Sequence, residues 1–366
     1  GYVFAMIILI IVGGQFGLIT TETFNNTLFV DVAYGFGVPF AITCFGGSIP
    51  FKSFKGEWKT CVIAIAAVVF IVALGAIAGF TVLDKVTALY GSVEVAGGTQ
   101  AGLIFLAQLK ETGEQKIAAI IAILMTGQVL VGYPACGYAL KKAMVKRLGD
   151  ESFSSLSAAG TGELLLADNS KKLIKVPEFL ANNFYYVFAV LALCCIGGYY
   201  IGEITGISMF VWDLLIGFIA AQLGLIDGDS LNKVGSGGFI DATMFAIILM
   251  DLVTINLKDF AGILPTLIAL LAFGVIGCAV AGVVLSKPMK MPFVDIFAIG
   301  LACLNGYPLT VKIVDECAEI VGQENGLSEE TRDRLLNFYK PKVVISGIVS
   351  VSVVTGILAG VLVSFV

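Results

Sequence analysis

Residues 86–109 read VTALYGSVEVAGGTQAGLIFLAQL, an apolar stretch interrupted near its centre by Gly97-Gly98-Thr99-Gln100. A second apolar stretch, residues 293–321, is interrupted at Asn305-Gly306-Tyr307-Pro308. Glycine and proline at these places interrupt the hydrogen-bond ladder of a membrane helix. Both stretches are therefore predicted to be broken helices rather than simple membrane spans.

The composition around the two breaks is that of an all-α integral membrane protein. Of the 366 residues, 58% are hydrophobic and only 13% are charged, whereas a soluble domain carries about 25% charged residues. Apolar runs of about 20 residues recur, which is the length that crosses a hydrocarbon core of roughly 30 Å. We expect membrane spans at about 2–20, 27–46, 59–82, 115–140, 183–203, 206–226, 238–256, 259–286 and 343–365.

The same composition excludes several classes of function. The chain has no histidine, which removes Ser-His-Asp and Cys-His catalysis and histidine-based metal sites. Its eight cysteines show no CxxC spacing, and most lie in apolar runs, where thiols act as small hydrophobic groups. The net charge of −5 argues against nucleic acid as a partner. An enzyme is therefore the least favoured class, and no cofactor or metal site is predicted.

The placement of lysine and arginine indicates how the two broken stretches sit in the membrane. If both are re-entrant, entering and leaving on the same side, most of the 22 basic residues collect on the inside. If residues 86–109 crossed fully, Lys52–Lys59 and Lys141–Lys175 would fall on opposite sides. The positive-inside rule favours the re-entrant arrangement. The first stretch then enters from outside and the second from inside.

The chain also resembles itself at an offset near 208 residues, which predicts two halves of inverted topology. We assign residues 1–146 to the first repeat, 147–180 to a polar cytoplasmic linker and 181–366 to the second repeat. The second half has one more span than the first, so we expect a further helix before Gly1. The matches are Gln15–Ile19 with Gln222–Ile226, Phe29–Asp31 with Phe239–Asp241, and the break at Gly98 with that at Gly306.

Inverted repeats with discontinuous helices at membrane depth are typical of secondary transporters. A broken helix exposes backbone N–H and C=O groups, each costing several kcal/mol if left unsatisfied in a medium of low dielectric constant. Helix N-termini suit an anionic substrate group, and freed carbonyls suit a cation. Two breaks entering from opposite faces would meet near the midplane, where a site can open to either side in turn.

These features resemble the bacterial sodium/glutamate symporter family and its 2-hydroxycarboxylate transporter relatives. The resemblance rests on two glycine-rich motifs, Val95-Ala-Gly-Gly-Thr-Gln-Ala-Gly102 and Asn305-Gly-Tyr-Pro-Leu-Thr310. The first departs from the family's Gly-Gly-His-Gly-Thr type of motif, because Thr99 stands at the histidine position. The resemblance implies an elevator-type transporter that is homodimeric and coupled to a cation, with Na⁺ as the expected ion.

The polar residues at the two breaks are the candidate substrate ligands. Gly97 and Gly98 would let the backbone approach substrate, although glycine also serves close helix packing in membranes. Thr99 and Gln100 would hydrogen-bond a substrate or an ion, or else cap the broken helix. Pro308 is expected to shape the break rather than bind. The predicted substrate-binding residues are Gly97, Gly98, Thr99, Gln100, Asn305, Gly306, Tyr307 and Thr310.

Two acids inside apolar segments, Glu94 and Asp251, are the candidate cation-coupling residues. An ionisable residue within a membrane segment is a functional hypothesis by default. Glu94 would bind Na⁺ or carry a proton, and the alternative is a place beside a water-filled vestibule. Asp31 and Asp241 lie close to helix starts, where a structural role is favoured. Lys312 would pair with Asp315 or Glu316 one turn away, or anchor a carboxylate.

The sequence as a whole predicts a multi-pass protein of a bacterial plasma or inner membrane, surrounded by lipid. We expect a secondary active transporter that moves an amino acid or organic anion, such as glutamate, coupled to Na⁺ or H⁺. The alternative is a membrane subunit of a larger transport or energy-coupling complex. A channel is less favoured, because no filter sequence is repeated by symmetry.

Overall fold

The structure is a computed structural model that describes residues 9–10, 12–20, 22–23, 26–47, 57–81, 83–149, 172–207, 209–240, 242–243, 250, 253, 257–306 and 309–363. Within these residues every regular element is a helix, which confirms the all-α prediction. The elements are α3 (Phe29–Val32), η1 (Ala33–Gly37), α4 (Val38–Gly47), α6 (Trp58–Thr81), α7 (Lys85–Thr112), α8 (Gln115–Leu148), α9 (Glu178–Ala181), α10 (Phe184–Thr205), α11 (Met209–Leu223), α12 (Ser230–Lys233), α14 (Leu257–Met289), α15 (Phe293–Gly300), η3 (Leu301–Leu304), α16 (Leu309–Glu324), α17 (Glu329–Ile348), η4 (Val349–Val354) and α18 (Thr355–Val363).

Five of the described helical runs are long and apolar enough to cross a membrane, as a multi-pass membrane protein requires. They also carry large apolar side chains on their outer surface, such as Phe80 and Leu193, which are 77% and 69% exposed. Lipid is the solvent that such side chains fit. The five runs are Trp58–Thr81, Gln115–Leu148, Phe184–Thr205, Ala261–Met289 and Glu329–Val363.

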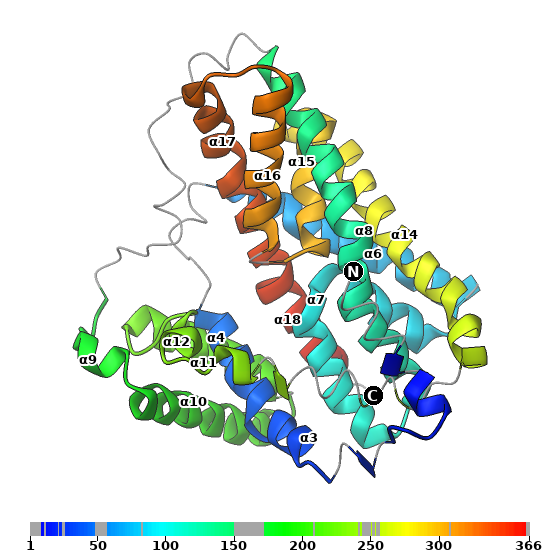
Figure 1. Ribbon diagram of the computed structural model, residues 1–366, viewed down its shortest axis with the longest axis vertical. Coiled ribbons are helices and arrows are strands. Elements are labelled where there is room, and N and C mark those ends of the chain that lie inside the picture. Colours follow the sequence, from blue (N-terminus) through cyan, green and yellow to red (C-terminus); the bar gives the residue numbers. More distant parts are fainter. Residues whose placement is uncertain are drawn as a thin grey trace.

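The helices pack as two groups that lie side by side (Figure 1). The larger group contains α6, α7, α8 and α14 through α18, and its helices contact one another extensively. The smaller group is built on α4, α10 and α11, which pack against each other. The two groups touch chiefly where α11 meets α18, with a smaller contact between α4 and η4.

Within the larger group, one order of elements occurs twice. The helix α6 is followed by the glycine-broken α7 and then by the long helix α8. In the same order, α14 is followed by the broken segment α15–η3–α16 and then by the continuous run α17–η4–α18. The positive-φ glycines Gly98 and Gly306 both lie 13 residues after the start of their segment, at Lys85 and Phe293 respectively.

The boundaries of some predicted spans differ from those observed. The span expected at 206–226 is the shorter helix α11, because Gly206 ends α10 in the left-handed conformation and Gly224 has φ +92°. The span expected at 343–365 begins earlier, at Glu329, since the polar segment 327–339 continues into it and buries Leu335 and Tyr339. Most of the predicted span 238–256 and of the linker 147–180 lies outside the described residues.

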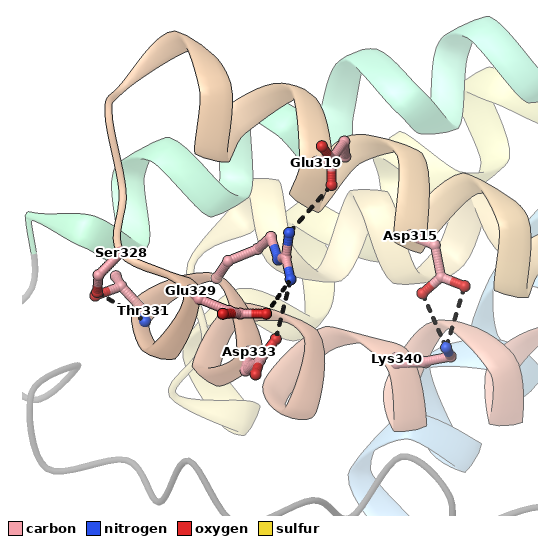
Figure 2. Close-up of polar contacts among 8 residues, drawn as sticks. Asp315, Glu319, Ser328, Glu329, Thr331, Asp333 and Lys340 are labelled. Carbon is pink, nitrogen blue, oxygen red and sulfur yellow. Dashed lines mark hydrogen bonds and ion pairs between the residues drawn. The ribbon is translucent and has the colours of Figure 1, made fainter.

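The turn between α16 and α17 is held by polar contacts (Figure 2). The side chain of Ser328 accepts a hydrogen bond from the backbone N–H of Thr331 and so caps α17. The guanidinium of Arg332 links back to Glu319 on α16 at 3.3 Å, and Lys340 pairs with Asp315 at 2.8 Å. The expected pairing of Asp315 with Lys312 is therefore wrong. Lys312 and Asp315 lie on the same helix, but Asp315 forms its ion pair with Lys340 of α17.

Candidate functional site: a junction of two helical hairpins

The broken segment α7 folds back on itself at Gly98. The rings of Tyr90 and Phe105 stack with their centroids 4.2 Å apart. Fifteen residues of unbroken helix would separate these positions by about 22 Å along the axis, so the two arms must lie against each other. In agreement, the carboxylate of Glu94 lies beside Gly102, with Oε2 2.8 Å from where a Cβ on that glycine would stand. The segment α7 is thus a helical hairpin whose tip is Gly98.

The tip of this first hairpin requires glycine at one position. Gly98 has φ 58° and ψ −153°, a backbone conformation that only glycine adopts without strain. The base of the hairpin is closed by ordinary caps. The carboxylate of Asp84 accepts from the backbone N–H of Thr87 at 2.9 Å, which lowers the pKa of that carboxyl below its usual value. Gly113 ends the second arm in the left-handed conformation.

The second broken segment is also a hairpin, because its two arms contact adjacent residues of α17 and, likewise, adjacent residues of α8. Asp295 on the first arm accepts a hydrogen bond from Tyr339, and Asp315 on the second arm pairs with the next residue, Lys340. Closer to the tip, the hydroxyl of Ser346 donates to the carbonyl of Ile299 on the first arm.

Contacts with α8 also show that the two arms of this second hairpin lie side by side. The thiol of Cys136 donates to the carbonyl of Ala298 on the first arm, and the carbonyl of the adjacent Gly137 accepts from Cys317 on the second arm. Residues 19 positions apart in the chain therefore face neighbouring residues of one helix. The arms α15 and α16 run antiparallel, and the tip lies between them at Asn305–Gly306.

The two hairpin tips meet one helical turn apart. On α8, Gln128 lies at the first tip, with its side-chain amide 3.1 Å from a Cβ placed on Gly98. One turn further on, a Cβ at Gly132 would stand 2.7 Å from Leu304 Cβ and 3.1 Å from Asn305 Oδ1 at the second tip. Four residues of helix span about 6 Å, so the tips are close neighbours.

The C-terminal run α17–η4–α18 also contacts both tips. A Cβ at Gly306 would lie 3.4 Å from Val351, and a Cβ at Gly97 would lie 2.5 Å from Thr355 Cβ. Between these contacts the helix adopts the π-helical segment η4, a rare geometry often found at functional sites. Figure 1 shows α15 and α16 above α7, with the C-terminal helix passing both. The hairpins therefore approach from opposite ends of the bundle and meet tip to tip.

A side-chain amide satisfies freed carbonyls at each break. In the orientation of the Gln128 amide that satisfies its hydrogen bonds, the nitrogen donates to the carbonyl oxygens of Glu94, at 3.2 Å, and Val95, at 3.1 Å. Gly98 and Thr99 would have donated to these carbonyls in an unbroken helix. At the second break, Asn305 Nδ2 donates to the carbonyl of Leu301 at 3.2 Å. These breaks are thus built to keep their first arms intact without a bound cation.

Several polar groups around the junction are buried and have no hydrogen-bond partner among the described residues. They are both carboxylate oxygens of Glu94, Oδ1 of Asn305 and Oγ1 of Thr310. Glu94 and Thr310 are fully buried, and Asn305 is 8% exposed. Buried polar atoms are normally paired. Unpaired acceptors and a hydroxyl close to the two glycine tips are typical of a place that binds a polar ligand.

The structure brings most of the predicted site residues to this junction. Gly97, Gly98 and the buried Gln100 lie at the first tip, while Asn305, Gly306 and Thr310 lie at the second. Asp251 and Tyr307 lie outside the described residues, as does the side chain of Thr99. Lys312 is exposed on α16, and its role as an anchor for a carboxylate stays a prediction.

Sequence reasoning missed two buried polar residues. Gln128 stands alone in the apolar run 117–132, and a lone amide in a predicted span was the available signal. Asp213 is the only acid of α11; it is fully buried and lies against Gly198 of α10, with its Cγ 3.0 Å from a Cβ placed there. Asp213 belongs to the smaller helix group and does not take part in the junction.

Replacing Gln128 with leucine is expected to lower the free energy of unfolding by about 1–3 kcal/mol for each carbonyl left unsatisfied. Leucine has a similar size but cannot donate to the carbonyls of Glu94 and Val95. The thermal unfolding midpoint in detergent measures the effect. Gln115→Leu, at an exposed position of the same helix, is the matched control and should change the midpoint little. Equal shifts in the two variants would contradict the role given to Gln128.

Comparisons with protein-family models and with curated proteins give no match to this chain. The junction combines two opposed hairpins, two helix N-termini and a buried acid, held between two long helices.

Proposed function

We propose that the chain is a secondary active transporter that moves a small carboxylate or amino acid across the membrane by alternating access. The observation that carries this proposal is the tip-to-tip meeting of two glycine-broken hairpins in the middle of the larger helix group. Each hairpin reaches the junction from one end only, so each is a natural gate for its own side. Broken helices that meet at membrane depth are the usual site of substrate binding in such proteins.

The second arms of the hairpins support an anionic substrate group. Both arms begin at the junction, at Gln100 and Leu309, and the N-terminus of a helix is the positive end of its dipole. Thr310, in the first turn of α16, adds a buried hydroxyl with no partner in the described part of the chain. The freed carbonyls of the first arms, in contrast, are already bonded to amides. We therefore place the substrate carboxylate against the second arms.

The doubled order of helix, hairpin and long helix supports an inverted repeat. In this proposal the units α6–α8 and α14–α18 are corresponding parts of the two repeats, residues 1–146 and 181–366, and their hairpins are re-entrant from opposite faces of the membrane. The equal position of Gly98 and Gly306 within their segments fits the sequence offset near 208. Repeats of this kind give a site that two equivalent gates can open in turn.

The division into two helix groups supports an elevator-type movement. The larger group would carry the junction, and the smaller group would form the fixed part, also in a homodimer. Their contact includes small residues, since a Cβ at Gly356 of α18 would lie 3.4 Å from Leu214 on α11 and 3.9 Å from Gln100 at the first tip. A contact made by glycine lets helices slide with little interlocking of side chains.

The direct test is uptake into liposomes that contain the purified protein. Radiolabelled L-glutamate, L-aspartate, malate and citrate are each offered under an inward gradient of Na⁺ or of H⁺. We expect accumulation of at least one probe above its equilibrium level, lost when an ionophore collapses the gradient. Protein-free liposomes are the control. Absence of gradient-driven movement of all four probes would contradict the proposal and favour a subunit of a larger complex.

A further inference from the structure

The carboxyl group of Glu94 is enclosed between the two arms of the first hairpin. Its side chain points from the first arm across to Gly102 on the second arm, where Oε2 lies 2.8 Å from the position of a Cβ. Met125 of α8 borders the same glycine, with its sulfur 2.6 Å from that position. The carboxyl thus lies against the backbone of Gly102, whose N–H faces it, and close to the thioether of Met125, and the residue has no exposed surface.

Among the described side chains, no charged group pairs with this carboxyl. The acids and bases of α6, α8 and α14 lie near the helix ends, namely Lys59, Lys116, Lys141, Lys142, Lys146, Arg147, Lys258, Asp259 and Lys287. The segments η3, η4 and α18 carry no charged residue, and Cys303 of η3 is their only titratable group. On α7 itself, Lys85, Lys110 and Glu111 lie at the base of the hairpin, and Tyr90 stacks on Phe105.

The same surroundings do not suit a metal cation. Hard cations are held by several oxygen ligands, but the carbonyls of Glu94 and Val95 are bonded to Gln128, and the sulfur of Met125 is a soft ligand. Among the described residues no group of three or more Cys, Asp or Glu side chains could hold a metal ion. An isolated ionised carboxylate in such a place costs several kcal/mol and is avoided by protonation.

We infer that Glu94 is the proton-carrying group of the transporter, neutral while the closed junction keeps it from water and ionised when either hairpin opens the junction to water. The inference rests on the proposed function and deepens it, because it names H⁺ rather than Na⁺ as the coupling ion. In each cycle the carboxylate takes one proton from water on one side. The closed junction buries the neutral carboxylic acid, and the proton returns to water on the other side when the second hairpin opens.

Gly102 couples the carboxyl to the movement of the hairpin. The arms can enclose Glu94 only because no side chain stands at residue 102, where a Cβ would also meet Met125. Separation of the arms would expose the carboxyl and Gly102 together. Protonation and closure are therefore linked in both directions, as thermodynamic coupling requires.

Infrared spectroscopy of the purified protein in lipid nanodiscs at neutral pH tests the protonation state directly. The carbonyl-stretch band of a protonated carboxylic acid should be present in the wild type, reduced in Glu94→Gln and unchanged in Glu114→Gln. Glu114 is the matched control because it is exposed in the turn after the same hairpin. A band of equal size in Glu94→Gln and wild type would overturn the inference. Loss of the wild-type band when NaCl replaces KCl would also overturn it.

The thermal stability of Glu94→Gln provides a second test of the protonation state that does not depend on transport. Glutamine is neutral and close in size to protonated glutamate, so its thermal unfolding midpoint at neutral pH should match that of the wild type. A large drop would show that the ionised form supports the fold and would contradict a neutral Glu94.

The transport arm separates failure of this inference from failure of the proposed function. Pyranine trapped in the liposomes reports internal pH while L-glutamate, L-aspartate, malate or citrate is added outside. We expect wild type to acidify the interior during uptake and Glu94→Gln to lose at least tenfold in pH-driven accumulation. Uptake that follows Na⁺ without acidification would refute proton coupling and leave the transporter proposal standing. If no probe moves, the transporter proposal fails, and the infrared result still decides the protonation of Glu94.

Discussion

Replacing Asp295 with asparagine is expected to destabilise the protein by about 3–5 kcal/mol, the usual effect of removing one partner of a buried ion pair. Asp295 pairs with Arg147 of α8, and the two side chains are only 3% and 13% exposed. Its other oxygen accepts from Tyr339 of α17 at 2.9 Å. One carboxylate thus ties the base of the second hairpin to both long helices, and its removal leaves a buried guanidinium without that charge.

Thermal unfolding in detergent, followed by the loss of the monodisperse peak in size-exclusion chromatography, measures this effect. The control is Glu330→Gln, which breaks the pair of Glu330 with Arg334 on the surface of α17, where Glu330 is 65% exposed. Exposed pairs contribute about 0–1 kcal/mol, so the control should shift the midpoint far less. If the two substitutions had equal effects, the tie at the base of the hairpin would be refuted.

Replacing Gly98 with alanine is expected to abolish uptake and to lower stability by about 1–3 kcal/mol, the usual strain of a residue held in this backbone region. Gly98 combines φ 58° with ψ −153°, and the new Cβ would stand 3.1 Å from the side-chain amide of Gln128. Relief of the strain would move the tip away from the amide that bonds the carbonyls of Glu94 and Val95.

Gly113→Ala is the matched control for this prediction. Gly113 also has positive φ, at 76°, but a Cβ there meets nothing within 4 Å, and it lies at the base of the same hairpin. A left-handed alanine costs roughly 1–2 kcal/mol, so stability falls in both variants, whereas uptake should fail only in Gly98→Ala. Normal uptake by Gly98→Ala would remove the first tip from the transport mechanism.

Local features of the sequence determined the class of the protein and the places where its helices break. Apolar runs of about 20 residues are stable as helices in lipid, so the membrane class and several spans follow from composition and length alone. The breaks at Gly98 and Gly306 could be recognised because glycine relaxes backbone constraints at the position where it occurs. Glu94 was recognisable because an acid is rare in an apolar run.

Only the tertiary structure decided what each break touches. Whether α7 crosses or folds back depends on the stacking of Tyr90 on Phe105, a contact between distant residues that leaves no local pattern. For the same reason Gln128 and Asp213 were missed: an amide or a lone acid acquires a role only from the groups that surround it. The predicted Lys312–Asp315 pair was wrong because helical spacing shows only partners on the same helix, whereas packing against α17 brings Lys340 to Asp315.

In the two glycine-broken segments, the position of the break follows from the sequence, whereas the contacts of each tip follow from the packing. That each would break, and at which residue, follows from the sequence, because backbone freedom is a property of the glycine itself. That their tips lie one turn apart, with Gln128 bonding the carbonyls of one and Gly132 packed on the other, follows from the packing of α8 between them. Such packing sums weak contacts between segments far apart in the chain, and only the folded arrangement specifies which of them form.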